Sequence, residues 1–177
     1  MSDDTNIEKA IEQVNGVLAG NPRAPHVKAF FHEPTFTATY VVSDDQTKRA
    51  AIIDSVWDFD QPSGRTSLEA ADEIIDYVRE AGLTVDWILE THAHADHLSA
   101  APYLQEKLGG EMAIGRDIVT VQGVFGKVFN EGTEFERDGS QFDRLFQDGD
   151  SYTIGGMPVF TIYTPGHTPA CWRMATS

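Results

Sequence analysis

The chain has 177 residues, of which 41% are hydrophobic and 23% charged, and this length suits one globular domain over residues 1–177 with a sizeable core. A formal net charge of −15 would repel phosphate backbones and anionic membranes, so we expect no nucleic acid and no membrane as a partner. No apolar run approaches the roughly 18 residues of a membrane span, and residues 1–9 lack the order of a signal peptide, so a cytoplasmic location is expected.

A single cysteine, Cys171, excludes an internal disulfide and any multi-cysteine metal framework. Nothing in the sequence pairs its thiol with a base, so we expect no nucleophilic role for it. Any metal bound by this chain must therefore rest on histidine and carboxylate side chains.

The first half of the chain predicts a mixture of helices and strands. An amphipathic helix is expected over residues 6–18, because its apolar residues fall on one helical face. Two apolar runs, 36–42 and 50–54, flank a polar turn and predict a hairpin of buried strands. A helix over 66–82 would open with a capping box, Thr66 with Glu69, and residues 85–90 then predict a buried strand.

The second half continues this alternation. A helix is expected from about residue 98 to 110, with Ser99 as its N-cap, followed by a short strand at 112–115 and a helix over 117–129. Residues 130–142 predict a surface loop, and the remainder predicts strands interrupted at two glycine-containing turns. The order of elements is that of a mixed α/β fold.

The segment "THAHADH", residues 91–97, directly follows the strand at 85–90 and holds three of the six histidines. A chance occurrence of H-x-H-x-D-H is on the order of one in a thousand, so we set aside the alternative of a merely hydrogen-bonded polar turn. His92 and His94 can converge only on non-helical chain, because residues i and i+2 diverge on a helix. The next turn would bring Asp96 and His97 beside them, and such ligands suit zinc, iron or manganese.

His167 in "TPGHT" follows a buried strand and is predicted to be a further ligand of this site. Asp54 ends a strand and is predicted to orient a ligand without binding the metal. Four other residues show no partner in the sequence and are expected to be structural or solvated: His26, His32, Asp58 and Asp60.

The motifs "THAHADH" and "TPGHT", with the hairpin ending in Asp54, resemble the metallo-β-lactamase superfamily. That resemblance implies an αββα sandwich with metal ions at the sheet edges. Within the superfamily, "TFTATYVVSD", "HADHLSAAPYLQEKLGG" and "NEGTEFERDGSQFDRLF" are similar to the persulfide dioxygenases, especially a bacterial branch named β-lactamase-like hydrolases. The resemblance runs from about residue 27 to residue 171.

The persulfide dioxygenase resemblance implies a mononuclear Fe(II) enzyme that oxidises glutathione persulfide with O₂ to sulfite and glutathione. It implies that His92 and His167 bind the iron and are the catalytic residues, together with a later aspartate. His94, Asp96 and His97 bind metal in the dinuclear hydrolases of the superfamily, and here they would instead hold the pocket around the iron.

The chain departs from the family after His167. No aspartate or glutamate follows Asp150, and the tail "ACWRMATS" does not continue the apolar strand of the family. We therefore expect the first half of the sandwich with only part of the second, an uncovered sheet face, and weak metal binding and activity.

Two other functions stay open. One is a dinuclear Zn(II) hydrolase of glutathione thioesters, like glyoxalase II, with a second metal at Asp96 and His97. The other is an inactive remnant or association module, in which the uncovered face could support a homo-oligomer.

Overall fold

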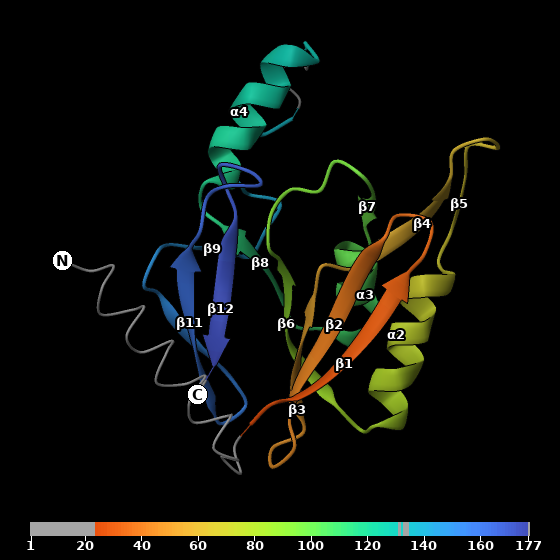
Figure 1. The fold of residues 1–177 in the computed structure, drawn as a ribbon, viewed down its shortest axis with the longest axis vertical. Helices are drawn as coiled ribbons and strands as arrows, with labels where there is room; N and C mark the ends of the chain where they lie inside the picture. Colours follow the sequence, from red (N-terminus) through yellow and green to blue (C-terminus); the bar gives the residue numbers. More distant parts are fainter. Residues whose placement is uncertain (1–23, 131, 133–134, 177) are drawn as a thin grey trace.

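The computed structural model describes residues 24–130, 132 and 135–176, so the helix expected at 6–18 lies outside the described residues. The largest element is a six-stranded sheet in the order β1-β2-β3-β6-β8-β9 (Figure 1). The first three strands pair antiparallel, and the pairs β3·β6, β6·β8 and β8·β9 are parallel. Its strands are β1 (His26–His32), β2 (Thr37–Asp44), β3 (Arg49–Ile53), β6 (Thr84–Glu90), β8 (Glu111–Gly115) and β9 (Arg144–Phe146).

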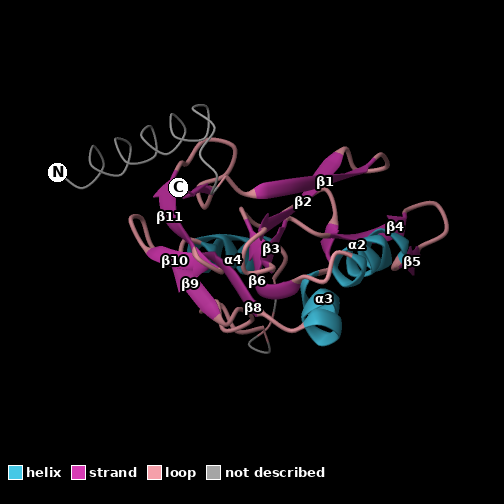
Figure 2. Cartoon of the chain, turned by 90° about the horizontal axis from the view of Figure 1, so that it is seen from below, coloured by secondary structure: helices cyan, strands magenta, loops and turns pink. Residues whose placement is uncertain are grey.

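The central strands β2, β3, β6 and β8 are buried on both faces of this sheet, and neighbouring residues along each strand point to opposite sides. On one face Val41 and Ile88 pack with two helices, α2 (Glu69–Glu80) and α3 (Ala101–Leu108). On the other face Val42 and Leu89 pack against a second sheet. Figure 2 shows α2 and α3 on one side of the six-stranded sheet and β10 and β11 on the other.

The second sheet contains β10 (Ser151–Ile154), β11 (Met157–Tyr163) and β12 (Trp172–Thr176), all paired antiparallel. The tail, which differs in sequence from the apolar strand of the family, nevertheless forms the strand β12. The side chain of Trp172 points into the core and is 4% exposed, while that of the next residue, Arg173, points outward. The inward tryptophan ring lies 5.2 Å from the ring of Phe146, and this burial fixes the tail as a strand.

The start of α2 differs from the predicted capping box. Thr66 belongs to a strand, β5 (Arg65–Ser67), which pairs with β4 (Val56–Asp60), so its side chain does not cap the helix. The backbone N–H of Ala70 instead donates to Asp58 Oδ2 at 3.0 Å. Asp58 and Asp60, expected in a loop, both lie on β4, and Asp58 supplies the cap from a neighbouring strand.

The start of α3 also lies later than expected. Leu98 and Ser99 form β7, which pairs with β4, and the helix begins at Ala101. Ser99 still contributes to the helix start, because its Oγ accepts the N–H of Ala101 at 3.0 Å. The predicted helix at 117–129 is present as α4 (Ile118–Val128), which projects beyond the sheets (Figure 1). Among the described residues no helix has the length and apolar character needed to cross a membrane.

Candidate metal centre

The histidine segment begins where β3 and β6 end side by side. These strands are parallel, so their carboxyl ends meet at one edge of the sheet, where loop residues are open to ligands. Asp54, just after β3, accepts the backbone N–H and the hydroxyl of Thr91, just after β6, each at 2.7 Å. Asp54 has a φ of 55°, a left-handed conformation that is uncommon outside glycine. The two strand ends are thus joined through one aspartate side chain.

His92 lies next to Thr91, and the hydrogen bonds of that threonine determine which imidazole nitrogen is free. Thr91 Oγ1 lies 2.9 Å from His92 Nδ1. Because the only hydroxyl proton of Thr91 is donated to Asp54, Oγ1 must accept a proton from His92 Nδ1. The lone pair of neutral His92 is then on Nε2, the nitrogen available to a metal. Burial, followed by the nearby charge of His94, lowers the pKa of His92 and so favours this neutral form.

His94 is held by two carboxylates. Its Nε2 lies 3.1 Å from Asp54 Oδ1 and 3.4 Å from Glu90 Oε2. Burial acts to lower the pKa of His94, but the hydrogen bonds to both acids outweigh burial and raise it to about 10. Burial likewise acts to raise the pKa of Asp54, yet its bonds to His94 and Thr91 leave that pKa below its ordinary value. With Nε2–H anchored in this way, Nδ1 is the atom that a metal would bind after losing its proton.

Glu90 is a site residue that our sequence reasoning missed. Its side chain is buried, and burial raises the pKa of its carboxyl group. Ser99 donates its hydroxyl to Glu90 Oε1 at 2.5 Å. The available signal was an acidic residue at the end of an otherwise apolar buried strand, a position that requires a partner.

The side chain of His97 is 1% exposed, less than the 9% of His94. Its Nδ1 lies 3.3 Å from Thr37 Oγ1 on β2 and 3.5 Å from Asp96 Oδ2. Its Nε2 is buried without a hydrogen-bond partner among the described residues. Burial and then the charge of His94 lower the pKa of His97, so its neutral form is favoured. A buried imidazole nitrogen with a lone pair and no partner is a candidate metal ligand.

His167 comes from the second sheet, in the loop between β11 and β12, and its side chain is exposed. Its ring meets that of His92 nearly edge to face, with centroids 4.9 Å apart. Cys171 helps to close this loop, because its Sγ accepts the N–H of Thr168 at 3.3 Å. Among the described residues, the hydrogen bonds of the thiol are to Thr168 and not to a histidine, so Cys171 stabilises the loop.

The remaining histidines occupy the two ends of β1. His26 is exposed at the end away from the motif. His32, which shows no partner in the sequence, has two partners in the structure. Its Nδ1 lies 2.7 Å from Thr35 Oγ1, and its Nε2 lies 3.0 Å from Asp58 Oδ1. Sequence spacing could not reveal these contacts, because Asp58 lies on a different strand.

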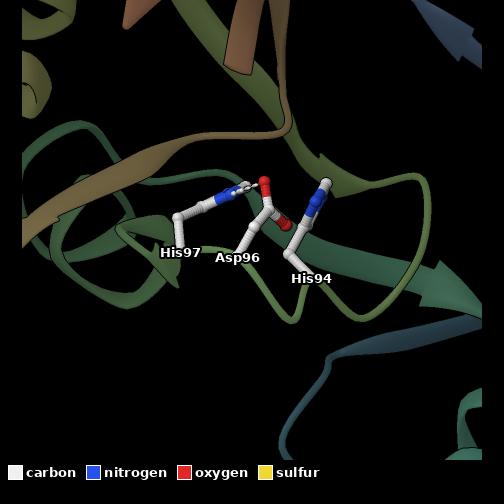
Figure 3. A group of neighbouring side chains, drawn as sticks. All are labelled: His94, Asp96 and His97. Atoms are coloured by element: carbon white, nitrogen blue, oxygen red, sulfur yellow. Dashed lines mark ion pairs between the residues drawn. The ribbon is translucent and has the colours of Figure 1, made fainter. Parts of the chain in front are cut away.

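The residues of the motif fit a metal ion. The ligand atoms of His94, Asp96 and His97 all lie within 4.8 Å of one another, and Figure 3 shows the Asp96 carboxylate between the two rings. Nitrogen and carboxylate donors of this kind suit Zn(II) and Fe(II). A cavity of about 260 Å³ adjoins the cluster and is lined by His92, His94 and His97, which leaves room for a substrate.

A family comparison agrees with this arrangement. The model of the metallo-beta-lactamase superfamily matches residues 32–175, which include every strand from β2 to β11 and every histidine of the cluster. The chain belongs to the metallo-beta-lactamase superfamily. The expected α/β fold of that superfamily is thereby confirmed.

Several known proteins are similar in sequence to the chain. It is 53% identical to "Probable metallo-hydrolase" of Burkholderia pseudomallei, over 82% of this chain and 49% of that protein. It is 46% identical to "Glyoxylase B2" of Dictyostelium discoideum, over 82% of this chain and 50% of that protein. Human "Persulfide dioxygenase ETHE1, mitochondrial" is 29% identical, over 86% of this chain and 48% of that protein. The chain thus spans about half the length of these curated relatives.

Among solved structures, ETHE1 from Myxococcus xanthus superimposes with a TM-score of 0.62 at 23% identity. The match covers 85% of this chain and 53% of that one. This likeness concerns the fold, and the chemistry must be argued from the residues of the site.

Proposed function

We propose that the chain provides the histidine-bearing half of a mononuclear iron enzyme that oxidises glutathione persulfide with O₂. The supporting observation is the meeting of His92 and His167, from two different sheets, with ring centroids 4.9 Å apart. His94, in contrast, is already engaged by Asp54 and Glu90 through Nε2. His92 and His167 are accordingly the residues that we assign to Fe(II).

When bound, the iron would bring persulfide sulfur and O₂ together at its open coordination positions. The residues of this chain would prepare the site for it. Asp54 and Thr91 hold the His92 ring through a chain of hydrogen bonds, and so fix the tautomer with a free Nε2. Glu90 and Asp54 hold His94 beside His92, where its ring forms one wall of the adjoining cavity.

The family resemblance implies a later aspartate as the third iron ligand, and residues 151–177 contain no acidic residue. About half of each relative lies outside the matched region, so those whole proteins contain many residues with no counterpart in residues 1–177. Loss of one of three protein ligands weakens metal binding severely, and we expect low iron occupancy for residues 1–177 alone.

A second candidate is a dinuclear zinc hydrolase of glutathione thioesters. One observation favours it: the ligand atoms of His94, Asp96 and His97 lie within 4.8 Å of one another, which would suit a second metal. The names "metallo-hydrolase" and "Glyoxylase B2" of two relatives are consistent with this alternative.

The experiment compares the 177-residue chain with a version extended by the C-terminal half of a persulfide dioxygenase. Both are purified anaerobically, with matched His92→Ala variants, and their iron and zinc contents are measured. Oxygen uptake with glutathione persulfide and hydrolysis of a glutathione thioester are then assayed on each.

We expect iron near one per chain and persulfide-dependent oxygen uptake in the extended version, and loss of both in its His92→Ala variant. Two zinc ions per chain with thioester hydrolysis would overturn the dioxygenase proposal in favour of the hydrolase. Absence of metal and of both activities in the extended chain would refute both candidates.

A further inference from the structure

A line of hydrogen-bonding groups runs from His97 to Asp58 on β4. His97 Nδ1 lies 3.3 Å from Thr37 Oγ1, which lies 2.9 Å from Thr35 Oγ1. Thr35 Oγ1 in turn lies 2.7 Å from His32 Nδ1, and His32 Nε2 lies 3.0 Å from Asp58 Oδ1. These five side chains connect a buried nitrogen of the metal centre to the strand that caps α2. The two threonines and His32 have no part in the proposed reaction itself.

Proton counting gives this line a direction. Each threonine hydroxyl has one proton and can donate to only one neighbour at a time. An ionised Asp58 can only accept, so Nε2 of His32 carries a proton in either charge state of the ring. Nδ1 of His32 is therefore the atom whose protonation determines how the two threonines point.

When His32 is neutral, its Nδ1 accepts from Thr35, which requires Thr37 to donate to Thr35 and Nδ1–H of His97 to donate to Thr37. His97 then has its lone pair on Nε2. When His32 is charged, its Nδ1–H donates to Thr35 and the three bonds between His32 and His97 reverse, so that Thr35 donates to Thr37, as in the structure. The bond from His32 Nε2 to Asp58 keeps its direction. Thr37 then donates to His97 Nδ1, so that neutral His97 carries its proton on Nε2.

The two tautomers of His97 differ in what they offer to a metal. Nε2 is the buried atom without a partner among the described residues, and its side chain is 1% exposed. A lone pair on Nε2 suits a metal ligand, whereas a proton there would have to be displaced first. Asp96 Oδ2, 3.5 Å from Nδ1, favours the tautomer with Nδ1 protonated, because a carboxylate accepts that proton.

We propose that His32 is a positioning residue, which acts through Thr35 and Thr37 to set the tautomer of His97 and hence the affinity of the centre for a divalent cation. When His32 is neutral, His97 Nε2 has a lone pair for the cation. When His32 is charged, that nitrogen carries a proton instead. The inference rests on the second candidate function, in which His94, Asp96 and His97 hold a metal ion, and not on the iron assigned to His92 and His167. The charged groups that surround His32 are Glu33, Asp58, Asp60, Arg65 and Glu73.

The first test needs no metal. The metal-free 177-residue chain is labelled with ¹⁵N in its histidine rings, and long-range ¹H–¹⁵N correlation spectra are recorded across pH. A change of tautomer moves the Nδ1 and Nε2 resonances of His97 in opposite directions, whereas protonation of the ring moves the lone-pair nitrogen alone toward the protonated position. We expect opposite movements in His97 with the same midpoint pH as the titration of His32.

Two variants at position 35 make this test specific. Thr35→Val keeps the shape of the side chain but removes the hydroxyl, and we expect the His97 tautomer to stop following His32. Thr35→Ser restores a hydroxyl and should restore the coupling, while His26→Gln, at the exposed end of β1, should leave it unchanged. The proposal would be overturned if the His97 tautomer of the parent did not change at the midpoint pH of His32. It would also be overturned if the same change occurred in Thr35→Val.

The second test uses Zn(II) alone as the probe, with affinity measured by competition against a chelator across pH. As the pH is lowered below the midpoint of His32, the zinc affinity of both proteins should fall. We expect the parent to lose an additional factor of about ten per pH unit relative to Thr35→Val, because zinc must displace one further proton from it. Zinc binding with equal pH slopes in the two proteins would refute the role of His32 while leaving the metal centre intact. Tautomer coupling without zinc binding would support the hydrogen-bond line and refute the metal function.

Discussion

Trp172 provides the sharpest prediction about stability. Its side chain is 4% exposed, its Nε1–H donates to the carbonyl of Glu90 at 2.9 Å, and its ring lies directly against Gly115. Replacing a buried tryptophan with alanine costs about 3–5 kcal/mol, of which the lost hydrogen bond contributes about 1 kcal/mol. For a chain of this size each kcal/mol lowers the melting temperature by about 2–4 °C, so Trp172→Ala should lower it by about 6–20 °C.

Urea denaturation followed by circular dichroism would measure this loss. Arg173→Ala is the matched control, because the neighbouring side chain is exposed and should change the free energy of unfolding by less than about 0.5 kcal/mol. Trp172→Phe should give an intermediate loss of about 1–3 kcal/mol, since it keeps a ring but leaves the Glu90 carbonyl unpaired. If Trp172→Ala and Arg173→Ala unfolded at the same urea concentration, the burial argument for the tail strand would fail.

Three further predictions concern the metal-free chain. Because the pKa of His94 is raised from 6.5 to about 10, its contribution to stability is complete below pH 6.5 and is lost as pH rises through 10. We expect the free energy of unfolding to fall by about 3–5 kcal/mol over that range, and His94→Gln to remove the fall in denaturation curves. Asp54→Asn should lower the pKa of His94, as measured by NMR titration, and an unchanged pKa would contradict our assignment of the ion pair. Asp58→Ala should destabilise α2 by about 1–2 kcal/mol in thermal melts, whereas Asp60→Ala, which caps no helix, should be nearly neutral.

Much of the site's position could be predicted from the sequence. The apolar run that ends at Glu90 predicted a strand leading directly into His92, and the polar turn after the preceding strand predicted a hairpin ending near Asp54. These signals are local, because strand length, alternation and turn composition are encoded within a few residues. Three histidines and an aspartate in one short segment are rare, and this rarity predicted that the segment binds a metal.

The parts that sequence reasoning missed depend on contacts between distant segments. Asp58 caps a helix from another strand, so Thr66, which had the favoured spacing, was assigned a role that it does not have. His32 acquires its partner only when β1 and β4 lie together. The tail at Trp172 has weak strand character by itself, and it forms β12 because its inward side chains complete a core built by earlier strands.

The left-handed backbone conformation of Asp54 restricts which residue types can occupy position 54. Most side chains would suffer a steric penalty at φ 55°, while glycine, which avoids it, would lose the carboxylate that joins Thr91 to His94. Asparagine tolerates the backbone, yet its amide would present donors toward partners that also donate. In a library of all twenty residues at position 54, selection for metal binding and selection for fold stability should therefore enrich different residues, and only aspartate should survive both.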